Sequence, residues 1–229
     1  MDDTDFDKSP FVVAVSAAVD PGDAGVGSTG LVRSAEARSR AGYGGAVWLA
    51  HGRVLGPPST PDTEVLMGLH FWRSRSDAEA FAAELTRTQQ NSEFDGVAVD
   101  DGIYRFSATV TANPDEATRV RTQDAQAHEI IRMAPVNGKQ GWVGEYNESE
   151  TRDHISHLEG FVSASFFRDL RSDRIVEYVQ WRSAADLTAA FNDARFAEHM
   201  SVNSHYSDGE AMLFEERSDG YAGTRRDEA

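Results

Sequence analysis

The most informative absence in this 229-residue chain is cysteine, of which it has none. Without cysteine there is no disulfide, no zinc–thiolate site, no cysteine-ligated iron–sulfur cluster and no thiol nucleophile. The usual signatures of acyl transfer, phosphoryl transfer and zinc proteolysis are missing as well, because no G-x-S-x-G, P-loop or H-E-x-x-H sequence occurs. Any chemistry must therefore use histidine, carboxylate, tyrosine, tryptophan, serine or arginine side chains, or a diffusible cofactor.

Basic residues are also scarce: 22 lysines and arginines stand against 38 aspartates and glutamates, so the formal net charge is −16. Nucleic acids and anionic membranes bind through Lys and Arg near phosphates, which makes both poor partners for this chain. No run approaches the ~18 consecutive apolar residues of a membrane-spanning helix. We therefore predict a cytoplasmic protein that binds neither nucleic acid nor membrane.

What the chain does contain is one order of strands and helices that occurs twice. Apolar β-branched runs predict strands, and alanine-rich segments with apolar residues at helical spacing predict helices. In the first half the predicted elements are strand 11–19, helix 31–41, strands 44–54 and 64–72, helix 74–90 and strand 103–111. In the second half they are strand 128–133, helix 148–158, strands 161–170 and 174–181, helix 183–191 and strand 209–216. Each half is thus predicted to be β-α-β-β-α-β.

A local repeat supports this doubling. Trp72-Arg73-Ser74-x-x-Asp77 and Trp181-Arg182-Ser183-x-x-Asp186 lie 109 residues apart, and each ends an apolar strand and opens an alanine-rich helix. In a Ser-x-x-Asp start the serine oxygen accepts from exposed backbone N–H groups, and the carboxylate favours the positive helix end. We therefore assign a structural role to Ser74, Asp77, Ser183 and Asp186.

The predicted fold class is α+β, with two tandem ferredoxin-like domains. A β-α-β-β-α-β unit forms a four-stranded antiparallel sheet with both helices on one face, and two copies can cover each other's free faces. The predicted organisation is an acidic disordered N-terminus at 1–9, a first domain at 10–111, a linker at 112–126, a second domain at 127–217 and a polar C-terminal tail at 218–229.

Two further patterns resemble a nucleotide-binding site and metal-binding sites, but the residues around them do not support either kind of site. Gly25-Val26-Gly27-Ser28-Thr29-Gly30 matches a dinucleotide-binding fingerprint, but its first glycine lies six residues past the strand and the second strand ends without an acidic residue. His154 and His157 form one histidine pair, and His199 and His205 another, but neither has a convincing third metal ligand. We predict neither a nucleotide site nor a metal site.

Strand alternation gives the candidate pocket, because residues two apart share a face of a sheet. Gly68, His70 and Trp72 project together from one strand, and Glu177, Val179 and Trp181 project together from its counterpart. A face with tryptophan and ionisable groups suits a planar phenolic ligand, with His70 as a base near its ordinary pKa of ~6.5. The alternative is that both tryptophans belong to the core.

The segment GFVSASFFRDLRSDRIVEYVQWRSAADLTAAFNDARF at 160–196 resembles the antibiotic biosynthesis monooxygenase family. The resemblance lies in Gly160-Phe161-Val162-Ser163, in the Tyr178-x-x-Trp181-x-Ser183 strand end and in the helix that follows. His70-Phe71-Trp72-Arg73-Ser74 makes the first half a more divergent copy, and together the copies cover roughly residues 10–217. The resemblance implies ferredoxin-like domains with antiparallel sheets that form a dimeric α/β-barrel-like body.

The resemblance also implies an activity. Small family members are quinone-forming oxygenases of polycyclic aromatic polyketides, and tandem members include angucycline ring-opening oxygenases that use reduced flavin or a reduced substrate. The family's asparagine four positions before the tryptophan is Gly68 or Glu177 here, and its tyrosine six positions after is Ala78 or Leu187. The helix histidine of haem-degrading members is Ala82 or Phe191, which disfavours haem cleavage.

The sequence therefore predicts an oxygenase of a polycyclic aromatic phenol or hydroquinone that forms a quinone or cleaves a ring with O2. The predicted catalytic residues are His70 and Trp72, and the predicted substrate-binding residues are Trp181, Glu177, Tyr178 and Trp48. No tightly bound metal is expected; reduced flavin (FADH2 or FMNH2) as a dissociable co-substrate, a flavin reductase and a homodimeric partner are further expectations. A cofactor-free cyclase or isomerase and a non-catalytic ligand-binding protein remain alternatives.

Overall fold

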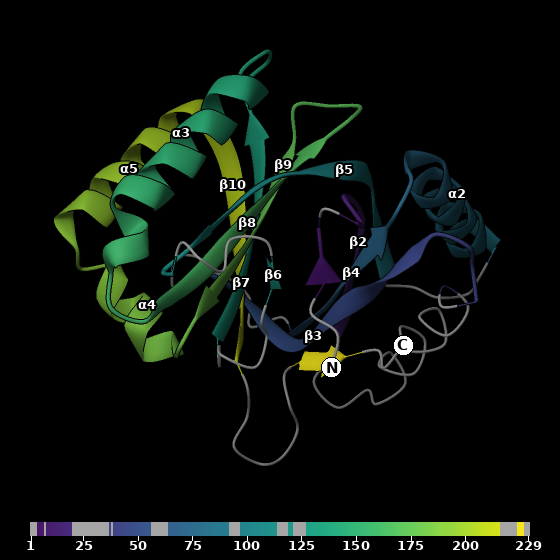
Figure 1. Ribbon diagram of the computed structural model, residues 1–229, viewed down its shortest axis with the longest axis horizontal. Coiled ribbons are helices and arrows are strands. Elements are labelled where there is room, and N and C mark those ends of the chain that lie inside the picture. The colour runs from purple at the N-terminus through teal and green to yellow at the C-terminus, as the bar shows by residue number, and fades with distance from the viewer. Residues whose placement is uncertain are drawn as a thin grey trace.

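The computed structural model describes residues 4–6, 8–19, 37, 39–55, 64–91, 97–113, 119–120, 127–215 and 224–226 (Figure 1). The strands of the first half are β1 (Thr4–Asp5), β2 (Phe11–Val19), β3 (Tyr43–Leu55), β4 (Glu64–Trp72), β5 (Val97–Thr111) and β6 (Arg119–Val120), with helix α2 (Arg75–Asn91). The second half has strands β7 (Ala127–Pro135), β8 (Phe161–Asp169), β9 (Ile175–Trp181), β10 (Ser207–Glu215) and β11 (Thr224–Arg226). Its helices are α3 (Gln140–Asp153), the 3-10 helix Ile155–His157, α4 (Ala184–Ala190) and α5 (Ala194–Tyr206).

Eight strands form a closed antiparallel ring within the single chain. The order is β10-β7-β9-β8-β5-β2-β4-β3, and β3 pairs again with β10, so that Val54 lies opposite Met212. Each half contributes four adjacent strands, β5-β2-β4-β3 and β10-β7-β9-β8, which is the same ferredoxin-like order twice. The predicted α+β class with antiparallel sheets is confirmed, and all strands of the barrel come from one chain.

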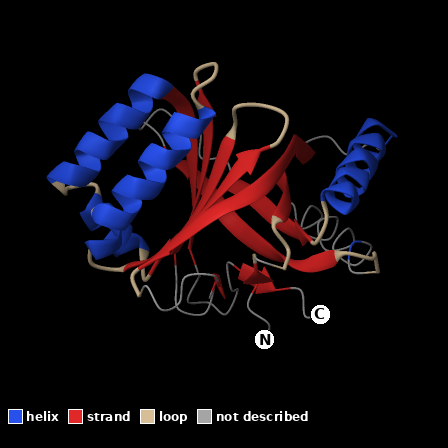
Figure 2. Cartoon of the chain, turned by 45° about the horizontal axis from the view of Figure 1, so that its top comes forward, coloured by secondary structure: helices blue, strands red, loops and turns tan. Residues whose placement is uncertain are grey.

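The inside of the ring is a packed apolar core. Alternate residues of all eight strands point inward, as expected for a small barrel whose interior is filled by side chains. Large buried members of this core include Leu49, Met67, Phe71, Phe167 and Phe214. The helices lie on the outer face of the ring, where α2 covers the first half and α3, α4 and α5 cover the second (Figure 2).

The two halves have the same structure at the corner where a strand leads into a helix. Ser74 Oγ accepts from the Asp77 backbone N–H at 3.1 Å, and Ser183 Oγ accepts from that of Asp186 at 3.1 Å. A glycine with positive φ packs against each aspartate, Gly42 at 80° and Gly160 at 82°, and a Cβ there would meet the aspartate side chain. The predicted caps are confirmed, and the corner requires glycine because an L side chain is strained at these φ values.

The structure corrects several sequence-based boundaries. Helix α3 begins at Gln140 rather than at 148, and helix α5 was not predicted at all. The segment predicted to be a disordered N-terminus contributes Phe6, which is buried in the barrel core. Its ring stacks on that of Phe106, with the two ring centroids 4.8 Å apart. The predicted linker and tail contribute β6, which pairs with β1, and β11, which pairs with β3. Most of the predicted helix 31–41 and the glycine-rich loop 25–30 lie outside the described residues.

Candidate active site

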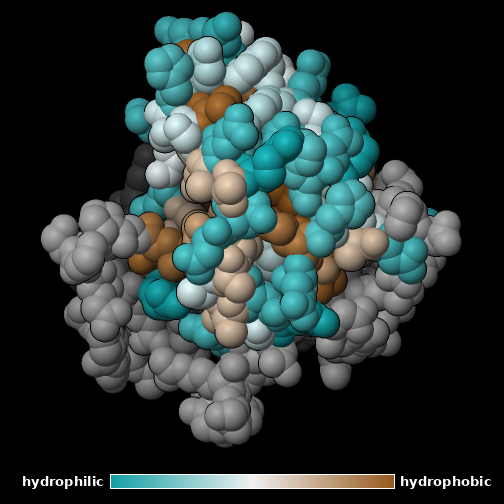
Figure 3. All heavy atoms as spheres, turned by 90° about the vertical axis from the view of Figure 1, so that its left-hand side faces the viewer, coloured by the Kyte–Doolittle hydropathy of each residue, from teal (hydrophilic) through white to brown (hydrophobic). Residues whose placement is uncertain are grey.

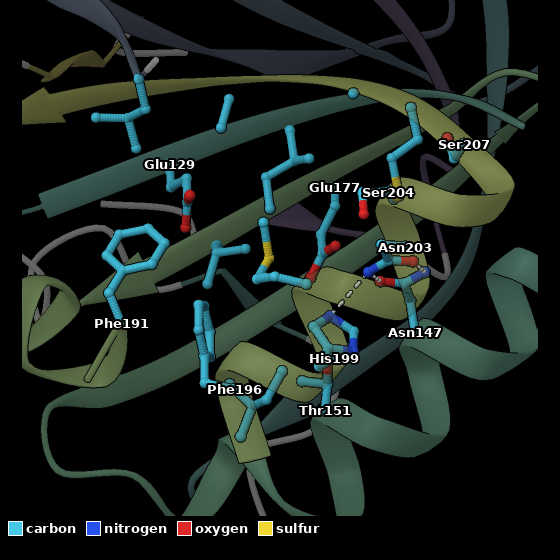
Figure 4. A pocket seen from close by; sticks show the side chains of 18 of the residues that line it. Glu129, Asn147, Thr151, Glu177, Phe191, Phe196, His199, Asn203, Ser204 and Ser207 are labelled. Atoms are coloured by element: carbon cyan, nitrogen blue, oxygen red, sulfur yellow. Dashed lines mark hydrogen bonds between the residues drawn. The ribbon is translucent and has the colours of Figure 1, made fainter. Parts of the chain in front are cut away.

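A cavity of about 650 Å³ lies between the sheet of the second half and helices α3 and α5 (Figure 4). Its floor comes from alternate residues of β7 and β9, and its roof comes from the two helices. Leu55 and its neighbours on β3 close one side, because β3 pairs with β10. Its lining includes Glu129, Glu177, Trp181, Asn147, His199 and Asn203.

Strand register brings two carboxyl groups and an indole together on the cavity floor. Glu129 on β7 lies opposite Val179 on β9, so its diagonal neighbours on the same face are Glu177 and Trp181. Diagonal neighbours on an antiparallel pair are about 7–8 Å apart, within reach of long side chains. The three side chains therefore form one group around Glu129.

Both carboxyl groups are buried and easily protonated. Glu129 is 4% exposed and Glu177 is 6% exposed. Burial raises the pKa of Glu129 to about 7. The nearby Trp181 indole N–H lowers this pKa by a smaller amount, although it makes no hydrogen bond of ordinary geometry to a described residue. Burial, followed by the charges of Glu129 and Glu148, raises the pKa of Glu177 to about 8. Near neutral pH one carboxyl can accept a proton while the other still holds one, the arrangement that acid–base catalysis needs.

A pair of asparagines fixes the histidine of the cavity. Asn147 Nδ2 donates to Val143 O at 2.8 Å and to Asn203 Oδ1 at 2.9 Å, and this sets the orientation of both amides. Asn203 Nδ2 then donates to Asn147 Oδ1 at 2.8 Å and to His199 Nε2 at 3.0 Å. Burial lowers the pKa of His199 to about 4, so the ring is neutral, and because Nε2 accepts, its proton sits on Nδ1.

The roof has room for the cavity because the helix after β9 is broken. α4 ends at Ala190, and Asp193 starts α5 by accepting from the backbone N–H groups of Arg195 at 2.8 Å and Phe196 at 3.1 Å. Between the two helices, Phe191 lines the cavity and is 44% exposed. Figure 3 shows the face of this half, where apolar surface appears in small areas between polar side chains. Phe191 and Met200, which are both exposed, form an apolar part of the cavity wall that reaches the surface.

The residues predicted from the sequence are distributed over three places. Glu177 and Trp181 line the cavity. His70 and Trp72 lie under α2, with ring centroids 4.8 Å and 4.9 Å from that of Phe81. Tyr178 faces the barrel core, where its hydroxyl lies 2.9 Å from His128 Nδ1.

Trp48 pairs through its backbone with Gly68, and its side chain lies outside the described part of the structure. Ala78 and Leu187, at the family's tyrosine position, are both core residues.

Sequence reasoning did not place Glu129, Asn147 or Asn203 in a site, and it considered His199 only as half of a histidine pair for a metal, which it rejected. The segment Glu129, Ile131 and Met133 alternates like a buried strand face, so a glutamate among apolar neighbours was a usable signal. His199 and Asn203 have helical i, i+4 spacing, but their helix was not predicted. Among the described residues, no three His, Asp or Glu side chains are grouped to hold a metal ion. None of the described helices is long and apolar enough to cross a membrane.

Comparison with known proteins identifies a relative in sequence. The chain is 35% identical over 92 residues to tetracenomycin-F1 monooxygenase from Streptomyces glaucescens. The aligned segment covers 40% of this chain and 73% of that protein. No family model matches the chain.

Solved structures resemble the whole chain. An anthrone oxidase-like protein superposes with a TM-score of 0.70 at 13% identity, covering 97% of this chain and 95% of that one. A provisionally named monooxygenase from Fusobacterium nucleatum gives a TM-score of 0.59 at 6% identity, covering 90% and 92% of the two chains. At these identities the structural matches show the fold.

Proposed function

Because the chain belongs to the antibiotic biosynthesis monooxygenase family, we propose that it is an oxygenase of a polycyclic aromatic polyketide and that its active site is the cavity of the second half. The observation that carries the proposal is the pair of buried carboxyl groups beside Trp181, both of which face that cavity with raised pKa. The sequence relative is named for tetracenomycin F1, which makes this compound the first substrate to test.

In the proposed reaction the substrate supplies all four of the electrons that reduce O2. The Glu129 carboxylate removes a proton from an anthrone-type or phenolic substrate, and the resulting anion gives one electron to O2. Superoxide and the substrate radical combine to form a carbon–oxygen bond, and the acid form of Glu177 protonates the peroxide. Loss of the second hydrogen and cleavage of the O–O bond complete the balance: one ring methylene and one O2 become one ring carbonyl and one water.

The protein contributes positioning and proton transfer. The cavity volume of about 650 Å³ lies in the usual range for small-molecule sites, and Trp181, Phe191 and Phe196 offer aromatic wall to a flat ring system. Burial keeps the two carboxyl groups away from water, which is what raises their pKa values into the working range. A carboxylate with a pKa of about 7 is a stronger base than an ordinary glutamate of pKa 4.5.

Oxygen uptake with purified protein tests the proposal. We expect tetracenomycin F1 or a simple anthrone to consume one O2 for each quinone formed, and 18O2 to label the new carbonyl. Parallel reactions with reduced flavin decide whether the co-substrate expected from the resemblance is needed. Glu129→Gln should lower the rate about 100-fold or more. Glu210→Gln, which changes an exposed glutamate on β10, is the matched control and should not change it.

Two outcomes would contradict the proposal and favour a cyclase or isomerase, or a binding protein, instead. Product formed under strictly anaerobic conditions would identify a cyclase or isomerase. Thermal stabilisation by ligand without any product, with and without reduced flavin, would identify a binding protein.

A further inference from the structure

One side of the cavity comes from the first half of the chain. β3 pairs with β10, and Arg53 and Leu55 of β3 line the cavity beside residues of the second half. The charged side chains of the described lining are Arg53 and three acids, Glu129, Glu177 and Asp208. Among the described lining residues, the positive charge is therefore supplied by the first half, in a chain whose net charge is −16.

A bulge in β3 turns Arg53 toward the cavity. Strict alternation would place Arg53 on the same face as Leu49, which packs in the barrel core. The pairing of β3 with β4 shifts between Leu49 and Gly52, so that Gly52 takes the next core-facing position. A Cβ at Gly52 would collide with the Phe214 ring, which is why this position requires glycine. The shift by one residue moves Arg53 from the core face to the outer face of the ring.

Strand register places Arg53 in line with the proposed base. Arg53 lies opposite Leu213 on β10, and Leu213 lies opposite Glu129 on β7. Leu213 packs in the same outer cluster as Trp181, so this row of residues faces the cavity side of the sheet. Neighbouring strands are about 4.8 Å apart, so the backbones of Arg53 and Glu129 are roughly 10 Å apart. Figure 4 shows Glu129 at the end of the cavity that also holds Phe191.

The ion pair that Arg53 makes with a described residue is a weak one. Its guanidinium lies 3.6 Å from the carboxylate of Glu215, and the two side chains are 54% and 47% exposed. Exposed pairs contribute about 0–1 kcal/mol, because water and salt screen them. Glu64 stands opposite Arg53 on β4, and its side chain lies outside the described residues. A guanidinium has five N–H donors, so it can bind a further acid beside these.

The acids of the cavity leave room for a negative charge. Burial raises the pKa of Glu129 to about 7 and that of Glu177 to about 8, so near neutral pH much of their charge is absent. Asp208 is exposed and lies near the start of β10, whereas Arg53 pairs near the end of that strand. An anionic ligand group therefore meets little repulsion at the end of the cavity where Arg53 lies.

We propose that Arg53 is a specificity-determining residue that binds a carboxylate group of the aromatic substrate, so that the first half completes the site of the second. The inference rests on the proposed function in taking the cavity as the substrate site, and it deepens it by naming a substrate feature that is recognised. A planar guanidinium presents two parallel N–H groups that match the two oxygens of a carboxylate. A phenol with the ordinary pKa of ~10 is neutral at pH 7 and offers no such charge. A carboxylate at Arg53 leaves the adjoining ring carbons near Glu129.

Binding of two matched ligands to the whole 229-residue chain measures this selection without turnover. Anthraquinone-2-carboxylate and anthraquinone-2-carboxamide share their rings and nearly their size but differ in charge, and quenching of tryptophan fluorescence reports both. We expect the carboxylate to bind at least about 10-fold more tightly, as charged hydrogen bonds allow. Arg53→Gln should reduce this preference below about 2-fold without weakening the amide, and Arg53→Lys should give an intermediate value.

A matched arginine controls for net charge. Arg75 of α2 is 51% exposed and pairs with Glu79 away from the cavity, so Arg75→Gln should keep the full preference. About 0.5 M salt should narrow the preference in the wild type, because it screens an exposed pair. Equal preference in wild type and Arg53→Gln, or a wild type that binds both ligands equally, would overturn the proposal.

The acid beside Arg53 provides a change in the opposite direction. Glu215→Gln removes a competitor for the guanidinium and should tighten the carboxylate about 2-fold to 5-fold without affecting the amide. Glu210→Gln removes the same charge from an exposed position on the same strand and should not. The same carboxylate affinity in both variants would overturn the proposal. A preference that depends on Arg53, found together with no oxygen uptake on any substrate, would instead count against the proposed function alone.

Discussion

The two halves of the chain share a strand order and a capped corner, but they differ in what fills the space between sheet and helix. In the first half α2 is continuous over 17 residues, and Phe81 packs against both His70 and Trp72. In the second half the corresponding helix is divided into α4 and α5, and the position 109 residues after Phe81 is Ala190. The position of Gly68 is taken by Glu177. Among the residues that the structure describes, a smaller side chain, a broken helix and a buried acid thus distinguish the second half, whose cavity is described above, from the first.

The comparison teaches that a repeated corner need not carry a repeated site. Trp72 and Trp181 end equivalent strands and are both buried, but their described neighbours differ: Trp181 has a carboxyl group as a diagonal neighbour and lines the cavity, whereas Trp72 packs against the rings of Tyr43 and Phe81. His70 has aromatic neighbours, whereas Val179 takes its place in the second half. We infer that the tryptophan belongs to the architecture of the corner and that the carboxyl groups specify the chemistry.

The largest expected effect decides which half carries the reaction. Replacing both Glu129 and Glu177 with glutamine removes the proposed base and acid and should lower kcat about 100-fold to 10,000-fold. His70→Leu removes a titratable ring from the first half and should lower kcat less than about 3-fold once loss of folded protein is corrected. Rates on tetracenomycin F1 or an anthrone, measured with circular dichroism as a folding check, test both. A larger loss in His70→Leu would move the site to the first half, where the sequence placed the base.

The tryptophans provide a paired test of the same comparison. Trp72→Phe and Trp181→Phe each leave space in a packed layer and should each lower the free energy of unfolding by about 1–2 kcal/mol. Trp181→Phe should in addition raise KM severalfold, because the indole forms part of the cavity wall, whereas Trp72→Phe should leave KM unchanged. Urea unfolding and steady-state kinetics on the same preparations separate the two effects. An unchanged KM in Trp181→Phe would make both tryptophans plain core residues.

Much of the fold could be predicted from the sequence, because strand periodicity and Ser-x-x-Asp caps are local signals. The break at Phe191-Asn192-Asp193 could not, since the alanine-rich segment before it continues the helical pattern and the new cap at Asp193 depends on two N–H contacts. Because α5 was not predicted, His199 and Asn203 were not recognised as neighbours on one helix beside the cavity. Glu177 and Trp181 were found because alternation places them on one face, but Glu129 joins them only through the pairing of β7 with β9.

The pH dependence of stability tests the buried acids of the second half. Their folded pKa values of about 7 and about 8 lie above the ordinary value of 4.5, so their contribution is fully present below pH 4.5 and is lost as the pH rises through 7 to 8. Between pH 7 and 8.5 the free energy of unfolding should fall by an amount on the order of 1–2 kcal/mol.

Glutamine variants locate the source of this slope. Glu177→Gln should remove most of it and Glu129→Gln a smaller part, because the group with the higher pKa loses its proton within this window. Glu79→Gln, an acid of the first half whose pKa is lowered by hydrogen bonds to Arg75 and Arg171, should leave the slope as it is. Denaturant midpoints across the pH range are the measurement, and a slope that survives in the double glutamine variant would contradict the assignment.

The smallest expected effect tests whether the two corners are equivalent. Ser74→Ala and Ser183→Ala each remove a serine oxygen that accepts a backbone N–H at 3.1 Å, and each also removes a hydroxyl that donates to Asp77 or Asp186. A lost N-cap costs about 1 kcal/mol, so the two variants should lose equal stability within a few tenths of a kcal/mol. Activity should be unchanged in Ser74→Ala. Because α4 is only 7 residues long and leads into the roof of the cavity, a rate loss confined to Ser183→Ala would show that this corner also positions α5 over the carboxyl groups.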